Sequence, residues 1–408
     1  MEARNGWIEK CNNNLLSGWI DWIDELDGLS RHVEVLIGGI SVQRCIVNIE
    51  NAQRPDLNGI NNAKSFSFEF DESIFIKEAK YCSICFYLCC GVYRFPLKVT
   101  RELLSTILSV IPDNQIGGLQ FGRSSKDGVA ALGAGGVIFL AQGTNVCSSI
   151  YKKDDLVDVL KWKNTVEARA GFLSEIGVDF CQIFIPEKSS VLHWKSPFPA
   201  SRGSQGYRSL ISSLRPLENL ILDGLQAFGD EVCSESMYRS FDTHLSTKGA
   251  IQIVDLFLAK NFPDFSSCYK PGDIFFGEID GDLGGRYGSD GQVIERLPMY
   301  KTLYRTDGTA LDPVLQETVD APDDCHIGIR RVWTCEHAPI RKKVICFGNS
   351  FFERGGTSTW LSWWFSRLFQ EFHFCWEVDM NHEYIKKENP DFVICQTVER
   401  FLIKIPQR

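Results

Sequence analysis

The sequence predicts an α/β protein with a small all-β domain at its amino-terminal side. Residues ~15–100 hold short segments that alternate between polar and apolar residues, or are apolar over strand length, with turn residues between them. From residue ~115 onward, segments with helical periodicity alternate with apolar runs of strand length. That alternation is typical of a parallel sheet covered by helices on both faces. We therefore expect a β-sandwich accessory domain at residues 1–110 and an α/β domain at residues 111–408.

Length and charge narrow the class of protein. The chain has 408 residues, which exceeds the size of one ordinary core and favours two domains. Its net charge of −9 argues against a nucleic-acid binder and gives no attraction to an anionic membrane. No apolar run approaches the ~18 residues of a membrane-spanning helix. The first residues lack the basic start and apolar run of a signal peptide, so we expect a cytoplasmic protein whose 15 cysteines are reduced.

Four segments in the amino-terminal part are predicted to be strands: HVEVLIGG, VQRCIVNIE, KSFSFEF and YCSICFYLCC. Turn pairs such as Gly38-Gly39 and Asn58-Gly59 separate them, as in a β-sandwich. The last of the four carries a group of cysteines whose spacing raises the alternative of a zinc site: Cys82, Cys85, Cys89 and Cys90. No second CxxC pair or nearby histidine completes such a site, so packing of buried thiols is the preferred interpretation and no metal is predicted.

The second part begins with a helical pattern over residues 154–177, and Gly177 stands where the helix would end. An apolar strand follows, bounded by Pro186. Further helices are expected at residues 219–229 and 358–372, and further strands at 372–378 and 390–398.

Two polar segments carry candidate chemistry. YRSFDTHLSTKGA places Asp242 two residues before His244, and a run typical of a helix start follows. KKVICFGNSF is an apolar strand that leads into a sharp turn with Ser350. Reactive groups in parallel sheets gather at the carboxyl ends of strands. A serine hydroxyl needs a histidine base, and an aspartate orients that base, so these three residues could form a Ser–His–Asp triad. The alternative for a short DxH segment is a surface hydrogen bond.

Such a triad also requires donors to the oxyanion of the tetrahedral intermediate. The backbone of the turn at Gly348 and Asn349 is one candidate source, and the side-chain amide of Asn145 is another.

The order of five segments adds a resemblance: PEKSSVLHW, FDTHLSTKGA, GDLGG, KKVICFGNSF and NPDFVICQTVERFL. Over residues ~120–405 this order is similar to the alginate O-acetyltransferase family, a branch of the SGNH hydrolase-like superfamily. The resemblance implies an SGNH-like sheet, with Ser350 as nucleophile, His244 as base and Asp242 as the acid that orients it. Two positions depart from the family pattern: Asn349 stands where Asp is usual in GDSF, and Leu245 where an aromatic often follows the histidine. The SGWIDW opening is similar to a β-sandwich module appended to bacterial glycan-modifying enzymes.

Three basic residues are candidates for binding substrate or donor. Arg400 follows the last apolar strand, and the alternative is a structural ion pair with Glu399. Lys188 lies just past another strand end, and Arg286 lies in a Gly-rich segment that also reads as a plain turn. Aromatic residues at helical spacing after Ser350 are either a sugar-stacking platform or core packing: Trp360, Trp363 and Trp364.

The resemblance implies a polysaccharide O-acetyltransferase that works through an acetyl-enzyme on a bacterial surface glycan or its precursor. A carbohydrate acetylesterase and a glycan-binding scaffold of a biosynthetic complex are the alternatives. We expect a polysaccharide or oligosaccharide acceptor, with a glycan-biosynthesis protein as a possible partner. No tightly bound cofactor is predicted. An acetyl donor is required, and acetyl-CoA is a candidate, although the GAGGV segment lacks the context of a phosphate-binding loop.

Overall fold

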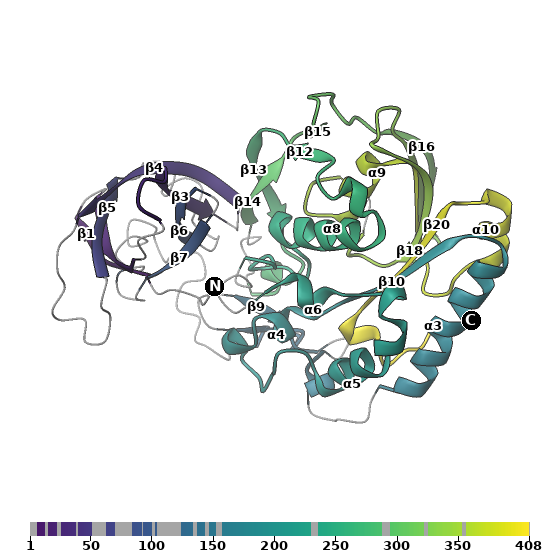
Figure 1. Cartoon of the computed structure of the whole chain (residues 1–408). Coiled ribbons are helices and arrows are strands. Elements are labelled where there is room, and N and C mark those ends of the chain that lie inside the picture. Colours follow the sequence, from purple (N-terminus) through teal and green to yellow (C-terminus); the bar gives the residue numbers. More distant parts are fainter. Residues whose placement is uncertain are drawn as a thin grey trace. The chain divides into compact units, whose positions relative to one another are not determined.

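The computed structural model of the chain is drawn in Figure 1. It describes residues 6–12, 15–22, 26–37, 40–50, 63–69, 84–91, 93–99, 103, 124–133, 137–142, 147–151, 157–229, 236–287, 294–321, 325–352 and 356–407. Contacts divide the chain into two compact units: the first comprises 1–118, 276–279 and 295–298, and the second comprises the remainder.

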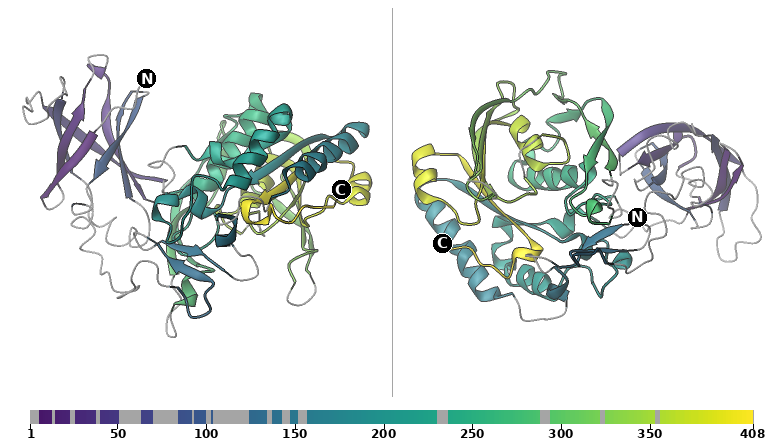
Figure 2. Two further views of the ribbon diagram at one scale, coloured as in Figure 1. Left: turned by 90° about the horizontal axis from the view of Figure 1, so that it is seen from below. Right: turned by 180° about the vertical axis from the view of Figure 1, so that it is seen from behind.

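The amino-terminal unit contains a closed seven-stranded barrel, drawn in purple and blue in Figures 1 and 2. Its strands are β1 (Gly6–Asn12), β2 (Leu15–Asp21), β3 (Arg31–Ile37), β4 (Ile40–Glu50), β5 (Ala63–Glu69), β6 (Ile84–Cys90) and β7 (Tyr93–Val99). Their order is β1-β2-β5-β4-β3-β6-β7, and parallel pairing of β1 with β7 closes the ring. The expected all-β domain is confirmed, although it is one closed sheet where a sandwich of two sheets was expected. Closure leaves no unpaired strand edge, while alternate side chains such as Val33, Val35 and Phe86 fill the interior.

The second unit is built on a seven-stranded sheet of order β11-β10-β20-β18-β19-β17-β16. The strands are β10 (Asp179–Ile185), β11 (Ile221–Asp223), β16 (Val314–Val319), β17 (Arg330–Thr334), β18 (Ile340–Gly348), β19 (Phe369–Trp376) and β20 (Phe392–Val398). The first five strands in the spatial order are parallel. Strand β17 runs antiparallel to both of its neighbours, β19 and β16, so the sheet is mixed and the expected parallel sheet is only its larger part. The link between β16 and β17 is too short for a crossover helix, which makes antiparallel pairing the available choice.

Helices cover both faces of this sheet, as the α/β prediction required (Figures 1 and 2). On one face α8 (Thr247–Asn261) and α9 (Leu361–Leu368) pack on residues such as Val344 and Cys346 of β18. On the other, α3 (Val159–Glu175), α5 (Gln205–Ser213) and α10 (His382–Glu388) pack on the alternate residues, such as Ile345 and Phe347. Both faces of the second half of β18 are therefore buried, which explains the apolar run from Val344 to Phe347.

Local predictions agree with the structure in part. Helix α3 ends before Gly177, whose φ of 72° is the left-handed conformation that glycine adopts readily. The prediction of a helix at 219–229 is wrong for part of that range, because Ile221–Asp223 forms the edge strand β11. Strand β19 begins at Phe369, three residues before the predicted strand, because the helix of the Trp-rich segment ends at Leu368.

The remaining helices and strands are short. They are β8 (Ala130–Leu132), β9 (Ile138–Leu140), α4 (Lys188–Val191), α6 (Gly224–Ala227), β12 (Tyr269–Pro271), β13 (Ile274–Asp280), β14 (Ile294–Tyr300) and β15 (Leu303–Arg305), with 3-10 turns at Cys147–Tyr151, His193–Lys195, Arg215–Leu220, Pro263–Phe265, Gly284–Arg286 and Glu399–Phe401. None of the helices in the described part of the chain combines the length and apolar character needed to cross a bilayer.

Candidate active site

The segment with Asp242 and His244 is fixed by the start of helix α8. Ser246 caps this helix: its hydroxyl accepts a hydrogen bond from the Gly249 N–H at 3.1 Å, and its own N–H donates to the Met237 carbonyl at 3.0 Å. A Cβ at Gly249 would lie 2.1 Å from that same carbonyl oxygen, so only glycine permits the approach. The helix start predicted after His244 is thereby confirmed, and it anchors the residues that precede it.

Asp242 and His244 are joined by a short hydrogen bond. His244 Nδ1 lies 2.7 Å from Asp242 Oδ1, and the His244 backbone N–H donates to the same oxygen at 2.7 Å. Asp242 is 3% exposed and His244 is 8% exposed. His244 Nε2 is buried and has no hydrogen-bond partner among the described residues. The arrangement orients the ring and leaves one nitrogen for a reacting group.

Arg239, which the sequence did not single out, is the second partner of Asp242. Its Nη1 donates to Asp242 Oδ2 at 3.1 Å, and its Nη2 donates to the Thr359 hydroxyl at 2.9 Å. Its guanidinium also lies 4.3 Å from the ring centroid of Trp360. Burial opposes the negative charge of Asp242, but Arg239 and His244 outweigh burial and hold the pKa of Asp242 well below its usual value. In the sequence, the position of this arginine three residues before Asp242 was the signal that could have identified it as a partner.

Asp282 is a second carboxylate near this histidine. Its Oδ2 accepts from the Thr243 hydroxyl at 2.6 Å and lies 3.9 Å from His244 Nδ1, while its N–H donates to Asp242 Oδ2 at 3.2 Å. The three groups Asp242, His244 and Asp282 are close enough to offer ligands to a cation. Both oxygens of Asp242 already accept hydrogen bonds from protein donors, so this donor set suits orientation of the imidazole better than metal binding.

Ser350 follows the carboxyl end of β18, as predicted. Asn349 Oδ1 accepts from the Phe351 N–H at 3.1 Å, and its backbone carbonyl accepts from Phe352 at 3.0 Å, which forms a tight turn around the serine. The Phe351 ring lies 5.1 Å from the His244 ring between centroids. The turn and the histidine therefore lie close together. No hydrogen bond joins Ser350 to His244 within the described ranges, and such contacts often tighten only when substrate binds.

Gln396, on β20, is a polar residue at this turn that sequence reasoning missed. Its Oε1 accepts from the Asn349 backbone N–H at 3.1 Å, and a Cβ at Gly348 would lie 3.1 Å from the same oxygen. Gln396 is 5% exposed, and its Nε2 has no partner among the residues described. The Asn349 N–H proposed for the oxyanion is thus already engaged. A glutamine inside an otherwise apolar strand was the signal in the sequence.

Two of the three basic residues expected to bind substrate or donor, Lys188 and Arg400, are buried in structural contacts. Lys188, 3% exposed, donates through Nζ to the carbonyls of Ile138, Ser240 and Asp242 at 2.7, 2.8 and 3.0 Å. It therefore supports the backbone that carries Asp242, and its ammonium is occupied.

Arg400 donates through Nη1 to Glu187 at 2.8 Å, so it forms the structural ion pair that was the alternative to a binding role, but with Glu187 in place of Glu399. Glu399 instead accepts from the backbone N–H groups of Glu187 and Ser204, and burial raises its pKa. Arg400 lies 5.6 Å from the Phe351 ring centroid. Its Nε is buried without a partner in the described part of the chain.

The other residues that the sequence analysis named as site candidates lie in different environments. Arg286 forms an exposed ion pair with Asp127, which leaves it at the surface. Asn145 lies outside the described residues. Trp363 and Trp364 are core residues, whereas Trp360 is half-buried and packs edge-on against His244 at 5.0 Å. Leu245, at the position where an aromatic was expected, is buried in the core under α8.

Comparison with known proteins gives remote similarities only. No protein-family model and no curated protein sequence matches this chain. Among solved structures, Bacillus cereus PatB1 with a sulfonyl adduct is 16% identical, with 62% of this chain and 93% of that chain covered and a TM-score of 0.45. The O-acetyltransferase domain of Pseudomonas putida AlgJ is 14% identical, with 68% and 94% covered and a TM-score of 0.42. Pseudomonas aeruginosa AlgX is 12% identical, with 67% and 66% covered and a TM-score of 0.41. These similarities are too remote to carry an argument about function.

Proposed function

We propose that the chain is an acyl-transfer enzyme in which Ser350 is the nucleophile, His244 the base and Asp242 the residue that orients the base. The observation that carries the proposal is the 2.7 Å contact of His244 Nδ1 with buried Asp242, together with the unpartnered Nε2 on the same ring. An imidazole held in this way presents one nitrogen as a proton acceptor. Support for Ser350 comes from its place in the strand-end turn, directly before Phe351, whose ring lies 5.1 Å from that of His244 between centroids.

The reaction has two steps with the same groups. Ser350 Oγ attacks the carbonyl of the acyl donor while His244 Nε2 accepts the hydroxyl proton, and the intermediate then expels the leaving group, which takes that proton. In the second step an acceptor hydroxyl attacks the acyl-enzyme, His244 removes its proton, and Ser350 leaves with the proton restored.

Gln396 is our candidate for a donor to the oxyanion. Because its Oε1 accepts from Asn349, its amide is oriented with Nε2 free to donate beside the serine turn. The Ser350 backbone N–H is a second candidate donor, and a role for Asn145 stays a prediction.

The proposed acceptor is a sugar hydroxyl of a polysaccharide or oligosaccharide. This proposal rests on the order of sequence segments that resembles the alginate O-acetyltransferases, and on Trp360, whose half-buried ring beside His244 could stack on a sugar. Acetyl-CoA as donor, a glycan-biosynthesis partner and a cytoplasmic location stay predictions.

The test is hydrolysis of p-nitrophenyl acetate by wild type, Ser350→Ala and His244→Ala, with and without an oligosaccharide acceptor. Lys386→Ala is the control, because this lysine lies on the exposed side of α10, where it pairs with Glu383. We expect nitrophenol release that requires Ser350 and His244 and survives in the control. Acetylated acceptor would identify a transferase, and hydrolysis alone an acetylesterase. Equal activity in all four proteins would contradict the proposed site and favour a glycan-binding scaffold.

A further inference from the structure

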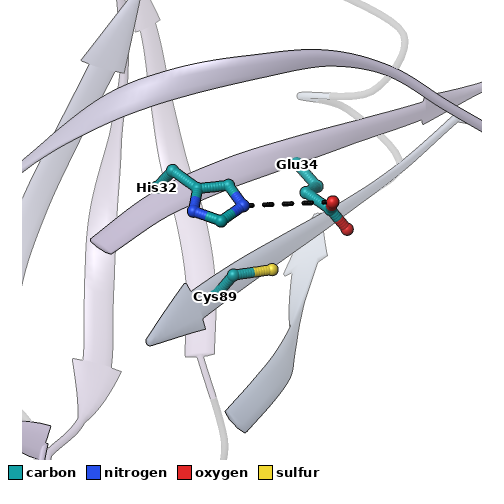
Figure 3. Close-up of side chains that lie close together, drawn as sticks. All are labelled: His32, Glu34 and Cys89. Carbon is teal, nitrogen blue, oxygen red and sulfur yellow. Dashed lines mark ion pairs between the residues drawn. The ribbon is translucent and has the colours of Figure 1, made fainter. Parts of the chain in front are cut away.

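Three side chains of the barrel bring different metal-binding atoms together (Figure 3). His32 and Glu34 come from β3, and Cys89 comes from β6. A histidine nitrogen, a carboxylate oxygen and the cysteine sulfur all lie within 4.8 Å of one another.

The pairing of the two strands explains this arrangement. His32 is directly opposite Cys89 in the antiparallel β3–β6 register. Glu34 is two residues after His32, so it lies on the same face of the strand. The alternate residues of the two strands, Val33 and Leu88, fill the interior of the barrel. The three polar side chains therefore share the outward face.

The spacing is close to that of a bound zinc ion. Zinc bonds of about 2.0–2.3 Å in tetrahedral geometry place ligand atoms roughly 3.3–3.8 Å apart. His32 Nε2 and a Glu34 oxygen are 3.9 Å apart, and the widest separation allowed by the cluster is 4.8 Å. Side-chain rotations that move atoms by about 1 Å would bring all three into bonding distance, with no change of the backbone register.

One of the three ligand atoms has no hydrogen-bond partner in the described part of the chain, and another belongs to a buried thiol outside any disulfide. His32 Nε2 is buried and makes no hydrogen bond with any described residue. The Cys89 thiol is free and 7% exposed, and its sulfur lies 3.9 Å from the Tyr87 carbonyl oxygen. Glu34, and Arg94 opposite Cys89 on β7, also lie beside this thiol.

Glu34 already has two arginine partners, which a metal would have to accommodate. Arg94 Nη2 lies 2.9 Å from Oε2, and Arg44 Nε lies 3.3 Å from Oε1. Arg94 can stay on Oε2 as an outer partner while Oε1 binds the ion, an arrangement common around ligating carboxylates. Arg44 competes for Oε1, but its side chain is 71% exposed and can turn into solvent.

We propose that His32 Nε2, Glu34 Oε1 and Cys89 Sγ form a binding site for Zn²⁺ on the outer face of the barrel. Binding replaces the thiol proton of Cys89, which passes to solvent, by a zinc–sulfur bond, and a water molecule would supply the fourth ligand. The proposal does not depend on the acyl-transfer function.

The experiment titrates Zn²⁺ into the metal-free full-length protein in competition with a chromogenic chelator, and repeats the titration with Co²⁺ to record the thiolate-to-cobalt absorption. Cys89→Ser and His32→Gln test the ligands. Cys45→Ala is the control, because Cys45 is an equally buried thiol of the same barrel that pairs with Val33 and faces the interior. Arg44→Gln removes the competing cation.

We expect one Zn²⁺ per chain and a thiolate-to-cobalt band in wild type and Cys45→Ala. Cys89→Ser and His32→Gln should each weaken binding more than about 100-fold, since outer-shell changes alone cost roughly 10- to 100-fold. Arg44→Gln should bind several-fold more tightly than wild type. Circular dichroism checks that each variant keeps the barrel, and His32→Gln decides the matter if Cys89→Ser does not fold.

Three results would overturn the proposal: no stoichiometric binding by wild type, equal binding by wild type and His32→Gln, or no gain from Arg44→Gln. The last result would remove Glu34 from the ligand set.

Discussion

At the scale of single residues, the site depends on a carboxylate that is kept charged inside the protein. Asp242 is buried, and burial alone would favour its neutral form. Arg239 on one oxygen and His244 on the other reverse that preference. The same contacts hold the imidazole ring in one orientation, so charge and geometry at His244 have a common origin.

Asp242→Asn should reduce the rate of ester hydrolysis about 10⁴-fold, because the amide no longer favours the required tautomer of His244. It should also lower the free energy of unfolding by about 3–5 kcal/mol, because Arg239 is left buried without its counter-charge. Nitrophenol release and urea unfolding at pH 7 measure the two effects. Asp282→Asn is the matched control, since its side chain is 42% exposed, and it should cost far less stability.

The stability effect of Asp242 should depend on pH in one direction. Its pKa is lowered in the folded state, so its contribution is complete above the usual value of 3.8 and is lost as pH falls below that value. The difference in unfolding free energy between wild type and Asp242→Asn should therefore be smaller at pH 3 than at pH 7. An unchanged difference would mean that the pKa of Asp242 is not lowered.

Gln396 offers a separate test of the proposed oxyanion donor. Gln396→Glu keeps an oxygen that accepts from the Asn349 N–H and has no donor once it is ionised, so kcat should fall about 10²–10³-fold as pH rises through the pKa of the new carboxyl, with little change in KM. Gln396→Asn keeps a donor on a shorter side chain and should retain part of the activity. Full activity in Gln396→Glu would exclude the amide as an oxyanion donor.

At the scale of elements, the start of helix α8 determines where His244 lies. The Ser246 cap and the close approach of Gly249 to the Met237 carbonyl hold this end of the helix against the preceding segment. The buried Lys188 ammonium, from the short helix α4, also holds two carbonyls of that segment, those of Ser240 and Asp242. The loop that carries Asp242 and His244 is thereby held both by the start of α8 and by Lys188.

Two helical glycines, Gly171 and Gly249, test whether the close approach at the start of α8 constrains the site. Gly171 in α3 has nothing within 4 Å of the position that a Cβ would occupy, so Gly171→Ala should raise the free energy of unfolding by about 0.5–1 kcal/mol. In Gly249→Ala the Cβ would meet the Met237 oxygen at 2.1 Å, so stability and ester hydrolysis should both fall. Thermal unfolding and nitrophenol release measure the pair. Similar gains in both variants would show that the contact at Gly249 does not constrain the site.

At the scale of the whole molecule, the described residues form separate hydrophobic cores. One lies inside the barrel and contains Phe86, and the two others cover the faces of the mixed sheet and include Phe257 of α8. Units with their own cores need not unfold in a single transition.

Core truncations should therefore act on different unfolding transitions. Phe86→Ala should destabilise the barrel by about 3–5 kcal/mol and leave ester hydrolysis unchanged in mild denaturant, whereas Phe257→Ala should lower the denaturant concentration at which activity is lost. Urea unfolding followed by circular dichroism and by activity separates the two. A single transition, shifted equally by both substitutions, would show that the units unfold together.

Periodicity in the sequence was sufficient for the main elements of the α/β unit. The helix that ends before Gly177 and the buried strands of VDFCQIFIP and PDFVICQTV follow from apolar spacing and one glycine. Periodicity failed where a pattern was short: Ile221–Asp223 reads equally well as helix or strand, and pairing with β10 decided it. Pairing also closed the barrel strands into a ring, since alternation is the same in a sandwich and in a barrel.

The sequence by itself determined the α/β class, the amino-terminal all-β domain and the proximity of Asp242 to His244, because each depends on residues near one another in the chain. Only the tertiary structure placed Gln396 on the Asn349 N–H, 47 positions away, and assigned Arg400 to Glu187 and Lys188 to the Asp242 backbone. It likewise set Cys89 opposite His32 across two strands. Long-range contacts of this kind follow from sheet order and register, which local spacing does not specify.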